Sequence, residues 1–494
     1  MGNLLGSPVT EKETETGVTS SGLEYGVSSM QGWRIHMEDA HICQPEITVP
    51  IRAPLNSRIR RREDGNGAAS TNVTELSATT AATLASAADS NDTSPSISVA
   101  GETIILRDHA LFAVFDGHGG SYSAIFSGKN FVRVLVNQPK FQEYAILYNS
   151  QKDSATLVEE SSGVANSSGG ETSSSHEMNA KLLDLLECSF RDAFVAMDDE
   201  ILISWEQTQN KKRKGDGMED VDDEHLVNAA NLNDVGNLEL PEEEEEENQT
   251  GGMDDSGTTA VVVLVTPTLI LCSNAGDSRA VYSKVKPVTS SSLTPTEGED
   301  NENEVASLSK TIPLSYDHKP DDEHEHDRIV TAGGYVSGGR VDGDLAVSRG
   351  LGDFRFKERG VLPPDQQKVS PVPDLLVQHR SPEHDEYIVV ACDGIWDVMS
   401  NPECTRAIQD IFNSGESNLG LACEEMLDLC LFKGSKDNMT TLIVKFPACT
   451  IGDRSLGGVF ARRAERERQV LEEKAAREAA QQGECNDSSN NHIS

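Results

Sequence analysis

Two aspartates each end an apolar run and are each followed by a glycine. Asp116 follows LFAVF at residues 111–115, and Asp393 follows IVVAC at residues 388–392. An apolar run closed by Asp-Gly is typical of a strand that delivers a carboxylate to the edge of a sheet. Carboxylate oxygens are the ligands that hard divalent cations such as Mg²⁺ prefer. If both strands end at one edge, the two aspartates can form the centre of a metal site.

Other acidic residues extend this set of ligands. Glu38 and Asp39 are adjacent, and Asp437 stands just before an apolar run at 439–446. A single Asp-Gly pair is more often an ordinary turn than a ligand. Two metal ions that share a carboxylate, however, can activate a water for attack on a phosphoryl group. The combination of these carboxylates therefore favours a metal-dependent hydrolase.

Arg34 and His118 lie close in sequence to the predicted ligands. A guanidinium suits bidentate binding of a phosphate, and an imidazole suits proton donation to a leaving oxygen. The alternatives are that Arg34 is an ordinary surface cation and that His118 is an ordinary loop histidine.

Composition limits the classes of partner. The chain has 494 residues, a formal net charge of -40 and 36% hydrophobic residues. So acidic a surface disfavours nucleic acid and favours basic proteins or basic substrate loops. The nine cysteines include no CxxC pair, which argues against a structural zinc site or a disulfide scaffold. No apolar run reaches the roughly 18 residues of a membrane helix, and the first residues lack the charged and apolar regions of a signal peptide. We expect a protein of the cytoplasm, the nucleus or both.

The amino terminus, MGNLLGSP, places Gly2 where N-myristoylation requires a glycine, but position 6 is Gly6 instead of serine or threonine. Residues 1–22 are therefore predicted to be a flexible leader, either acylated or plain. A single acyl chain binds membranes only weakly and reversibly. The expected membrane contact is at most peripheral.

One domain is predicted over residues 23–450, followed by a charged, partly helical tail at 451–494. Stretches too polar to pack are expected to be disordered insertions in this domain. The third insertion carries the basic tetrad 211–214, which is either a nuclear localisation signal or a chance cluster, and an acidic run at 242–247 that is more simply a solvated spacer. The predicted insertions lie near 52–103, 150–177, 207–252 and 285–310.

Periodicity predicts an α+β fold instead of a doubly wound parallel sheet, because helices and strands do not alternate strictly and two strands flank Thr266-Pro267 as in a hairpin. The tail from about 457 to 481 is predicted to be an exposed helix, since it has strong helix formers but few apolar positions. Strands are predicted near 110–115, 259–265, 268–274, 279–283, 387–392 and 439–446, and helices near 120–137, 178–205, 400–414 and 419–432.

The chain resembles the metal-dependent Ser/Thr protein phosphatases of type 2C, the PPM family. The resemblance covers about residues 22–446 without the insertions. It implies a central antiparallel β-sandwich flanked by antiparallel helix pairs. The segments that carry it are YGVSSMQGWRIHMEDAH (25–41), FAVFDGHGG (112–120), SGTTAVVVL (256–264), NAGDSRAV (274–281), LAVSRGLGDF (345–354), VVACDGIWDVMSN (389–401) and KGSKDNMT (433–440).

The resemblance also implies two Mg²⁺ or Mn²⁺ ions. Asp116 would bridge them, Asp393 and Asp437 would complete the protein ligands of one ion, and Glu38 with the Gly117 carbonyl would serve the other. Arg34 would hold the substrate phosphate and His118 would act as general acid. Asp39 would support the metal ligands from behind. No phosphoenzyme is expected.

The family's weaker third metal site would use Asp393 and an aspartate just before SGTTA. Both Asp254 and Asp255 stand there, and register favours Asp254. Asp277 and Asp353 also fall within the matching segments, but they are interpreted as residues that fix turns. The segment after Asp353, RFKERGVLPPDQQKV, departs from the family pattern, which leaves the substrate open.

The leading hypothesis is hydrolysis of phosphoserine and phosphothreonine in proteins by direct attack of a metal-activated water. An alternative of a different class is a phosphopeptide-binding scaffold that recruits partners through its acidic insertions. A two-metal nuclease is a third hypothesis, and the net charge of -40 disfavours it.

Overall fold

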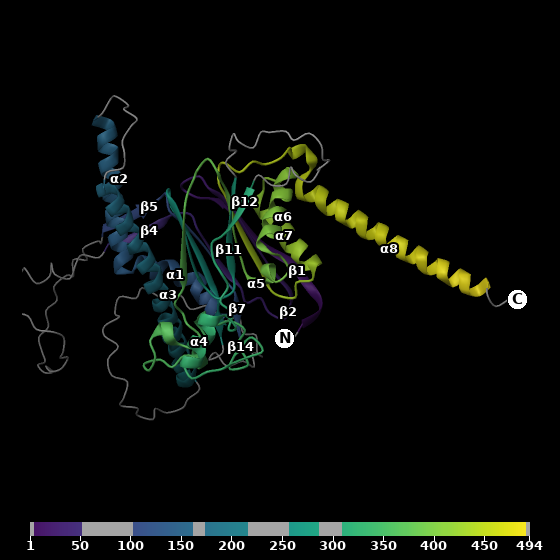
Figure 1. The fold of residues 1–494 in the computed structure, drawn as a ribbon, viewed down its shortest axis with the longest axis horizontal. Helices are drawn as coiled ribbons and strands as arrows, with labels where there is room; N and C mark the ends of the chain where they lie inside the picture. The colour runs from purple at the N-terminus through teal and green to yellow at the C-terminus, as the bar shows by residue number, and fades with distance from the viewer. Residues whose placement is uncertain (1–3, 52–101, 162–172, 216–255, 286–308, 491–494) are drawn as a thin grey trace, which may run out of the picture.

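Two antiparallel sheets face each other, and helices cover their outer faces (Figure 1). The computed structural model describes residues 4–51, 102–161, 173–215, 256–285 and 309–490. The first sheet has the order β1 (Leu4–Val18), β2 (Glu24–Arg34), β18 (Met439–Lys445), β17 (Asp385–Ala391), β11 (Arg279–Val285) and β12 (Ser309–Pro313). The second has the order β16 (Asp374–His379), β10 (Leu269–Ala275), β9 (Ala260–Val265), β6 (Ala110–Phe115) and β3 (Ala40–Gln44).

The remaining described strands form three smaller sheets. One of them joins the segments of His118 and Gly352, because Gly257 pairs with both residues. The small sheets are β4 (Ile47–Ile51) with β5 (Glu102–Leu106), β13 (Val336–Ser337) with β14 (Arg340–Val341), and β7 (Gly117–His118) with β8 (Gly257–Thr258) and β15 (Leu351–Gly352).

Two helical layers flank the sandwich. Helices α1 and α3 pack on the second sheet, and α2 packs against α3 and the small sheet of β4 and β5, whereas α5, α6 and α7 pack on the first sheet. The longer helices are α1 (Tyr122–Val136), α2 (Pro139–Ser161), α3 (Ser173–Gly215), α4 (Glu323–Thr331), α6 (Asn401–Asn413), α7 (Leu419–Lys433) and α8 (Gly458–Asn490). The short ones are α5 (Asp393–Trp396) and the 3₁₀ turns Phe354–Phe356, Pro364–Gln366 and Arg454–Leu456.

The apolar runs of the central strands follow from this layering. In β9, Val261, Val263 and Val265 point between the sheets, whereas Ala260, Val262 and Leu264 point towards α1 and α3. In β17, Ile388 and Val390 likewise face the other sheet, while Tyr387 and Val389 face α6 and α7. A strand buried on both faces reads as a continuous apolar run, because neither set of alternating side chains meets water.

Local signals set the limits of the helices on the first sheet. Ser400 and Glu403 form a capping box at the start of α6. Asn418 accepts hydrogen bonds from two backbone N–H groups at the start of α7, and Gly434 ends that helix with φ 99°. Such caps satisfy backbone groups that a helix end leaves unpaired.

The predicted α+β sandwich, the hairpin across Thr266-Pro267 and the predicted strands and helices are confirmed. The tail helix is also present, and it extends away from the body of the protein (Figure 1). Among the described residues, no helix is both long enough and apolar enough to cross a membrane.

The flexible leader is a wrong prediction for residues 4–18, which form β1 and pair with β2 along the edge of the first sheet. The insertion predicted at 150–177 is also wrong in part. Helix α2 continues to Ser161 and α3 already begins at Ser173. Of this predicted insertion, only residues 162–172 lie outside the described residues. The acidic run at 242–247 lies outside it as well.

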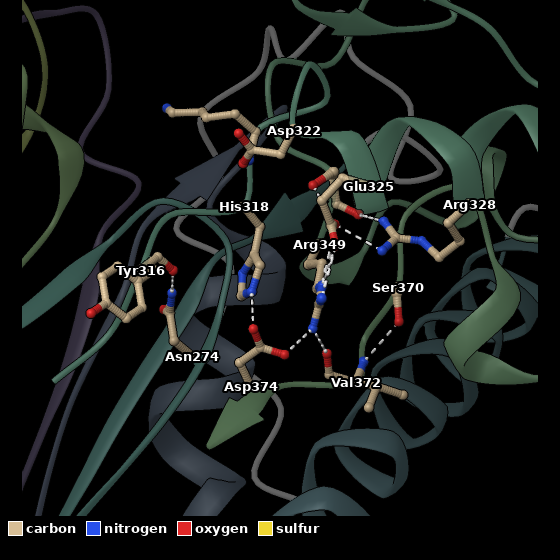
Figure 2. A network of polar contacts seen from close by, with 12 residues as sticks. Asn274, Tyr316, His318, Asp322, Glu325, Arg328, Arg349, Ser370, Val372 and Asp374 are labelled. Atoms are coloured by element: carbon tan, nitrogen blue, oxygen red, sulfur yellow. Dashed lines mark hydrogen bonds and ion pairs between the residues drawn. The ribbon is translucent and has the colours of Figure 1, made fainter. Parts of the chain in front are cut away.

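A polar network holds the region around α4 to the loop that follows β14 (Figure 2). The Glu325 carboxylate is almost fully buried and accepts hydrogen bonds from Arg328 Nη1 at 2.8 Å, Arg349 Nη2 at 2.8 Å and Ser348 Oγ at 2.6 Å. Arg349 Nη1 also donates to Asp374 Oδ1 at 2.7 Å. This network fixes the start of the loop that leads to Asp353.

Candidate metal centre

The two Asp-Gly pairs converge where one strand of each sheet ends. Asp116 follows β6 of the second sheet, and Asp393 follows β17 of the first and begins α5. The backbone N–H of Asp393 lies 3.4 Å from Asp116 Oδ2. The Asp116 carbonyl accepts hydrogen bonds from Thr259 N–H at 2.9 Å and Thr258 Oγ1 at 3.1 Å. The sandwich therefore brings two carboxylates from distant segments to one edge.

These two carboxylates are electrostatically unfavourable by themselves. Burial, and next the charge of Asp393, raise the pKa of Asp116 well above its usual value. Burial, and next the charge of Asp277, do the same to the pKa of Asp393. Carboxylates in such a position are stabilised when a cation lies between them. The donor set thus fits hard divalent cations.

Asp39 belongs to the same cluster, as predicted for a residue behind the ligands. Its Oδ2 accepts a hydrogen bond from Thr440 Oγ1 at 2.6 Å, while its buried Oδ1 has no partner among the described residues. Burial raises its pKa to about 7. Ligand atoms of Asp39, Asp116 and Cys392 lie within 4.8 Å of one another. An acceptor without a donor is a second feature that a nearby cation would satisfy.

Cys392 was not predicted at the centre. Its thiol is fully buried, and burial raises its pKa well above the usual value. The sulfur accepts from Thr440 N–H at 3.1 Å. A thiol that stays protonated is a poor metal ligand, so Cys392 acts here as packing behind the carboxylates.

Glu38 and Gly117 lie against each other in space. A Cβ on Gly117 would lie 2.2 Å from the Glu38 carbonyl oxygen, so only glycine allows this approach. Glu38 Oε1 accepts from Gly120 N–H at 2.9 Å, and its own N–H donates to Asn438 Oδ1 at 3.0 Å. The loop after β2 is thereby fixed against both the Asp116 segment and the Asp437 segment.

Arg34 and Asp437 form an ion pair with Arg34 Nη2 2.5 Å from Asp437 Oδ2. Burial lowers the pKa of Arg34, but the Asp437 carboxylate, followed by those of Asp116 and Asp393, raises it overall. The guanidinium therefore stays charged beside the carboxylate cluster. About a third of the Arg34 side chain is exposed, which leaves it accessible to an anionic ligand.

His118 pairs with Asp353, a residue that sequence reasoning interpreted as a turn former. His118 Nε2 lies 2.8 Å from Asp353 Oδ1 and 3.0 Å from Oδ2. Burial lowers the pKa of His118, but the Asp353 carboxylate outweighs burial and raises it overall. The 235 positions between them explain why no sequence signal revealed the pair.

Two further aspartates near the centre were not predicted as ligands. Asp277 is buried and pairs with Lys319, and its charge contributes to the raised pKa values of Asp116 and Asp393. Asp397 stands four residues after Asp393 in DGIWD, the spacing that places two side chains on one face of a helix. That spacing is the signal that could have drawn attention to it. Asp254 lies outside the described residues, so the predicted third metal site stays a prediction.

Comparison with known proteins finds similarity to protein phosphatases. The family model described as "Protein phosphatase 2C" matches residues 173–439. "Protein phosphatase ppm-1.A" of Caenorhabditis elegans is 30% identical over 448 residues, which are 91% of this chain and 64% of that protein. "Protein phosphatase 2C homolog 2" of Hypocrea jecorina is 30% identical over 461 residues, 90% of this chain and 67% of that protein. The chain thus covers less than two thirds of the nematode relative.

The fold is also similar to a solved structure. The crystal structure of serine-threonine phosphatase 2C from Toxoplasma gondii matches with a TM-score of 0.50 and 18% sequence identity. The match covers 88% of this chain and 99% of that one. At this identity the likeness supports the fold only.

Proposed function

The chain belongs to the protein phosphatase 2C family, and on this premise we propose that it hydrolyses phosphoserine and phosphothreonine in proteins with two divalent metal ions. The observation that carries the proposal is the convergence of Asp116 and Asp393. The backbone nitrogen of Asp393 lies 3.4 Å from the Asp116 carboxylate oxygen Oδ2. Burial and neighbouring carboxylates raise the pKa of both groups, and a cation bound between them would favour their charged forms. A phosphate ester is the kind of anionic substrate that such a centre attracts.

The proposed ligands are the carboxylates at this edge of the sandwich. Asp116 would be shared by two Mg²⁺ or Mn²⁺ ions, Asp393 and Asp437 would bind one of them, and Glu38 with the Gly117 carbonyl would bind the other. When bound, the ions would supply positive charge to the phosphate oxygens and lower the pKa of water. Asp254 is proposed for a weaker third site.

Arg34 would bind the substrate phosphate. Its guanidinium is charged and partly exposed, and its planar N–H groups match two phosphate oxygens. Arg34 Nη2 donates to Asp437 Oδ2, so a bound phosphate would compete with this ion pair for at least one N–H group. Asp39 would hold its segment in place through Thr440.

His118 would give a proton to the oxygen of the departing serine or threonine. Its pKa is raised overall by Asp353, which favours the protonated ring that a general acid requires. The alkoxide of a serine or threonine is a strongly basic leaving group, so a positioned acid matters for this substrate class. No covalent phosphoenzyme is required, because no side chain of the proposed set acts as a nucleophile.

Substrate class is the first point to test. Purified protein with Mn²⁺ would be given a phosphothreonine peptide, a phosphotyrosine peptide of the same sequence and single-stranded DNA. We expect phosphate release from the phosphothreonine peptide, little from the phosphotyrosine peptide and no cleavage of DNA. Retention of the phosphothreonine peptide without phosphate release would contradict the proposal and indicate a binding scaffold. Cleavage of DNA at a comparable rate would indicate a nuclease.

The charge of the whole chain and its Gly2 lead to a proposal about substrates and location. The formal net charge of -40 favours phosphoproteins whose docking surfaces are basic. We propose action in the cytoplasm, the nucleus or both, with peripheral membrane contact if Gly2 is acylated. Inhibition of turnover of a basic phosphopeptide by added salt, with less inhibition for an acidic one, would support the charge preference.

A further inference from the structure

A buried carboxylate on α3 binds the loop that carries Asp353. Asp198 Oδ1 accepts hydrogen bonds from the backbone N–H of Gly352 at 2.8 Å and from Lys357 Nζ at 2.7 Å. Lys357 Nζ also donates to the Gly350 carbonyl at 3.1 Å. The Asp198 and Lys357 side chains are only 5% and 1% exposed. One ion pair therefore holds both ends of a tight loop from Gly350 to Lys357.

The backbone inside this loop is strained. Gly352 has φ 80° and Asp353 has φ 53°, and Asp353 is one of only two non-glycine residues with positive φ in the described part of the chain. A left-handed conformation at a non-glycine residue persists only when surrounding contacts enforce it, and such strain often marks a functional site. Around Asp353 these contacts include its N–H bond to the Ser256 carbonyl at 3.1 Å and the bonds that Asp198 makes on either side.

The strained residue is the one that holds His118. Gly257 pairs with His118 on one side and with Gly352 on the other, so three short strands place the imidazole beside the loop. A Cβ on Gly257 would lie 2.3 Å from the Asp353 carboxylate, which shows how tightly that carboxylate is enclosed. The Asp353 side chain is 2% exposed. A change in the backbone at Gly352 would therefore turn the carboxylate away from His118 Nε2.

We propose that Asp198 is a positioning residue for the reaction: through Gly352 and Lys357 it keeps the Asp353 carboxylate hydrogen-bonded to His118. The inference rests on the proposed function, in which His118 is the general acid. Asp198 itself contacts neither the carboxylate cluster nor His118 in any hydrogen bond of the described chain. Its effect on the reaction is therefore predicted to pass entirely through the histidine.

The competing explanation is that Asp198 only stabilises the fold. Substrates with different leaving groups distinguish the two explanations. A buried ion pair is weak support for stability by itself. A loop that only stabilises the fold would change the rate on all substrates alike. Loss of a positioned acid instead slows a phosphothreonine peptide, whose leaving group is strongly basic, and leaves 4-nitrophenyl phosphate nearly unaffected, because nitrophenolate leaves without a proton.

The experiment measures kcat on both substrates for wild type, Asp198→Asn and the matched control Asp199→Asn, whose side chain is 53% exposed and pairs with Arg359. We expect Asp198→Asn to lower kcat on the peptide by about 10- to 100-fold and kcat on 4-nitrophenyl phosphate by less than about threefold. Asp199→Asn should leave both rates within about twofold of wild type. Equal losses on the two substrates, or no loss on either, would overturn the inference.

Two further variants keep the test decisive. In a His118→Gln background, Asp198→Asn should cause no further loss on the peptide, because residues that act as one unit are not additive. Independent losses that multiply would overturn the inference. If Asp198→Asn does not fold, the pair Asp198→Leu with Lys357→Met replaces the ion pair by apolar side chains and takes its place. A wild-type protein inactive on both substrates would instead refute the proposed function.

Discussion

Asp116 and Asp393 are 277 positions apart in the chain, yet the backbone N–H of Asp393 lies 3.4 Å from Asp116 Oδ2. Asp116 follows a strand of the second sheet and Asp393 follows a strand of the first. The contact between them therefore forms only when the two sheets pack against each other. Burial raises the pKa of both carboxylates, and neighbouring aspartates raise them further. The edge of the sandwich is thus built at a cost in stability that a bound cation would offset.

Replacing Asp116 by Asn should separate stability from activity. The Asp116→Asn variant without metal should unfold at a higher temperature than wild type without metal, because one of several buried like charges is removed. A gain of about 1 kcal/mol corresponds to roughly 1–2 °C for a domain of more than 250 residues. Thermal unfolding with and without Mn²⁺ checks this.

Thermal unfolding with Mn²⁺ also tests whether Asp116 binds the metal. Mn²⁺ should raise the unfolding temperature of wild type, since a ligand that binds only the folded state stabilises it. It should raise that of Asp116→Asn much less. Equal shifts for both proteins would contradict a role for Asp116 in metal binding.

Arg34→Lys should weaken substrate binding more than it slows the chemical step. A lysine keeps the charge beside Asp437 but loses the planar pair of N–H groups that matches a phosphate. Because a hydrogen bond to a charged group contributes about 1.5–3 kcal/mol, we expect KM for a phosphothreonine peptide to rise about 10- to 100-fold. Steady-state kinetics with inorganic phosphate as inhibitor provide the check, and an unchanged KM and inhibition constant would exclude Arg34 as the phosphate-binding residue.

Glu325 should contribute to stability in a pH-dependent way. Burial alone would raise its pKa, but Arg349 and Arg328 lower it from 4.5 to about 2 (Figure 2). A carboxylate with a lowered folded-state pKa stabilises the protein fully above its unfolded-state pKa, and the contribution is lost as the pH falls towards 2. A pKa difference of one unit is worth about 1.4 kcal/mol, so Glu325 contributes about 3 kcal/mol to the free energy of unfolding at neutral pH.

Urea unfolding of wild type and Glu325→Gln at several pH values tests this. The difference in free energy of unfolding should be constant from pH 7 to about pH 5 and shrink below that. A difference that does not change between pH 7 and pH 3 would show that the network does not act through the charge of Glu325.

The C-terminal helix α8 should depend on one buried carboxylate of α7. Glu425 is fully buried and pairs with Arg462, Arg463 and Arg466 at the start of α8. Glu425→Gln removes the buried carboxylate that these three cations share, while Arg463 keeps Glu424 and Asp428 as partners. Removing one partner of a buried pair costs about 3 kcal/mol or more. Arg468→Ala is the control, because Arg468 is 64% exposed and pairs only within α8.

Limited proteolysis gives the readout for that prediction. Cleavage within residues 458–470 should become faster in Glu425→Gln and stay at the wild-type rate in Arg468→Ala. The reverse order, or equal rates in all three proteins, would show that the arginine cluster does not hold the helix.

The central strands could be read from the sequence because they are buried on both faces, as β9 and β17 show. The same argument explains the failure at β1. Its residues, LLGSPVTEKETETGV, are mostly exposed and polar, and the strand is held by backbone pairing with β2 and by contacts such as Lys12 with Asp428. An edge strand with no buried face leaves no periodic signal.

The candidate site divides in a similar way. Asp116 and Asp393 were predictable because each stands at the end of an apolar run. The pairing of His118 with Asp353 was not, because it depends on a left-handed backbone at Asp353 and on the fit of Gly257 against that carboxylate. Geometry of this kind arises only when three separate segments are packed together.

Phosphate release from a phosphothreonine peptide is the measurement that tests the central claim most directly. Wild type and Asp393→Asn would be assayed with Mg²⁺, with Mn²⁺ and with excess EDTA, after circular dichroism has established that both are folded. The account predicts turnover by wild type with either metal, none with EDTA and a loss of at least about 100-fold in Asp393→Asn. Turnover that persists in EDTA, or an Asp393→Asn variant as active as wild type, would contradict it.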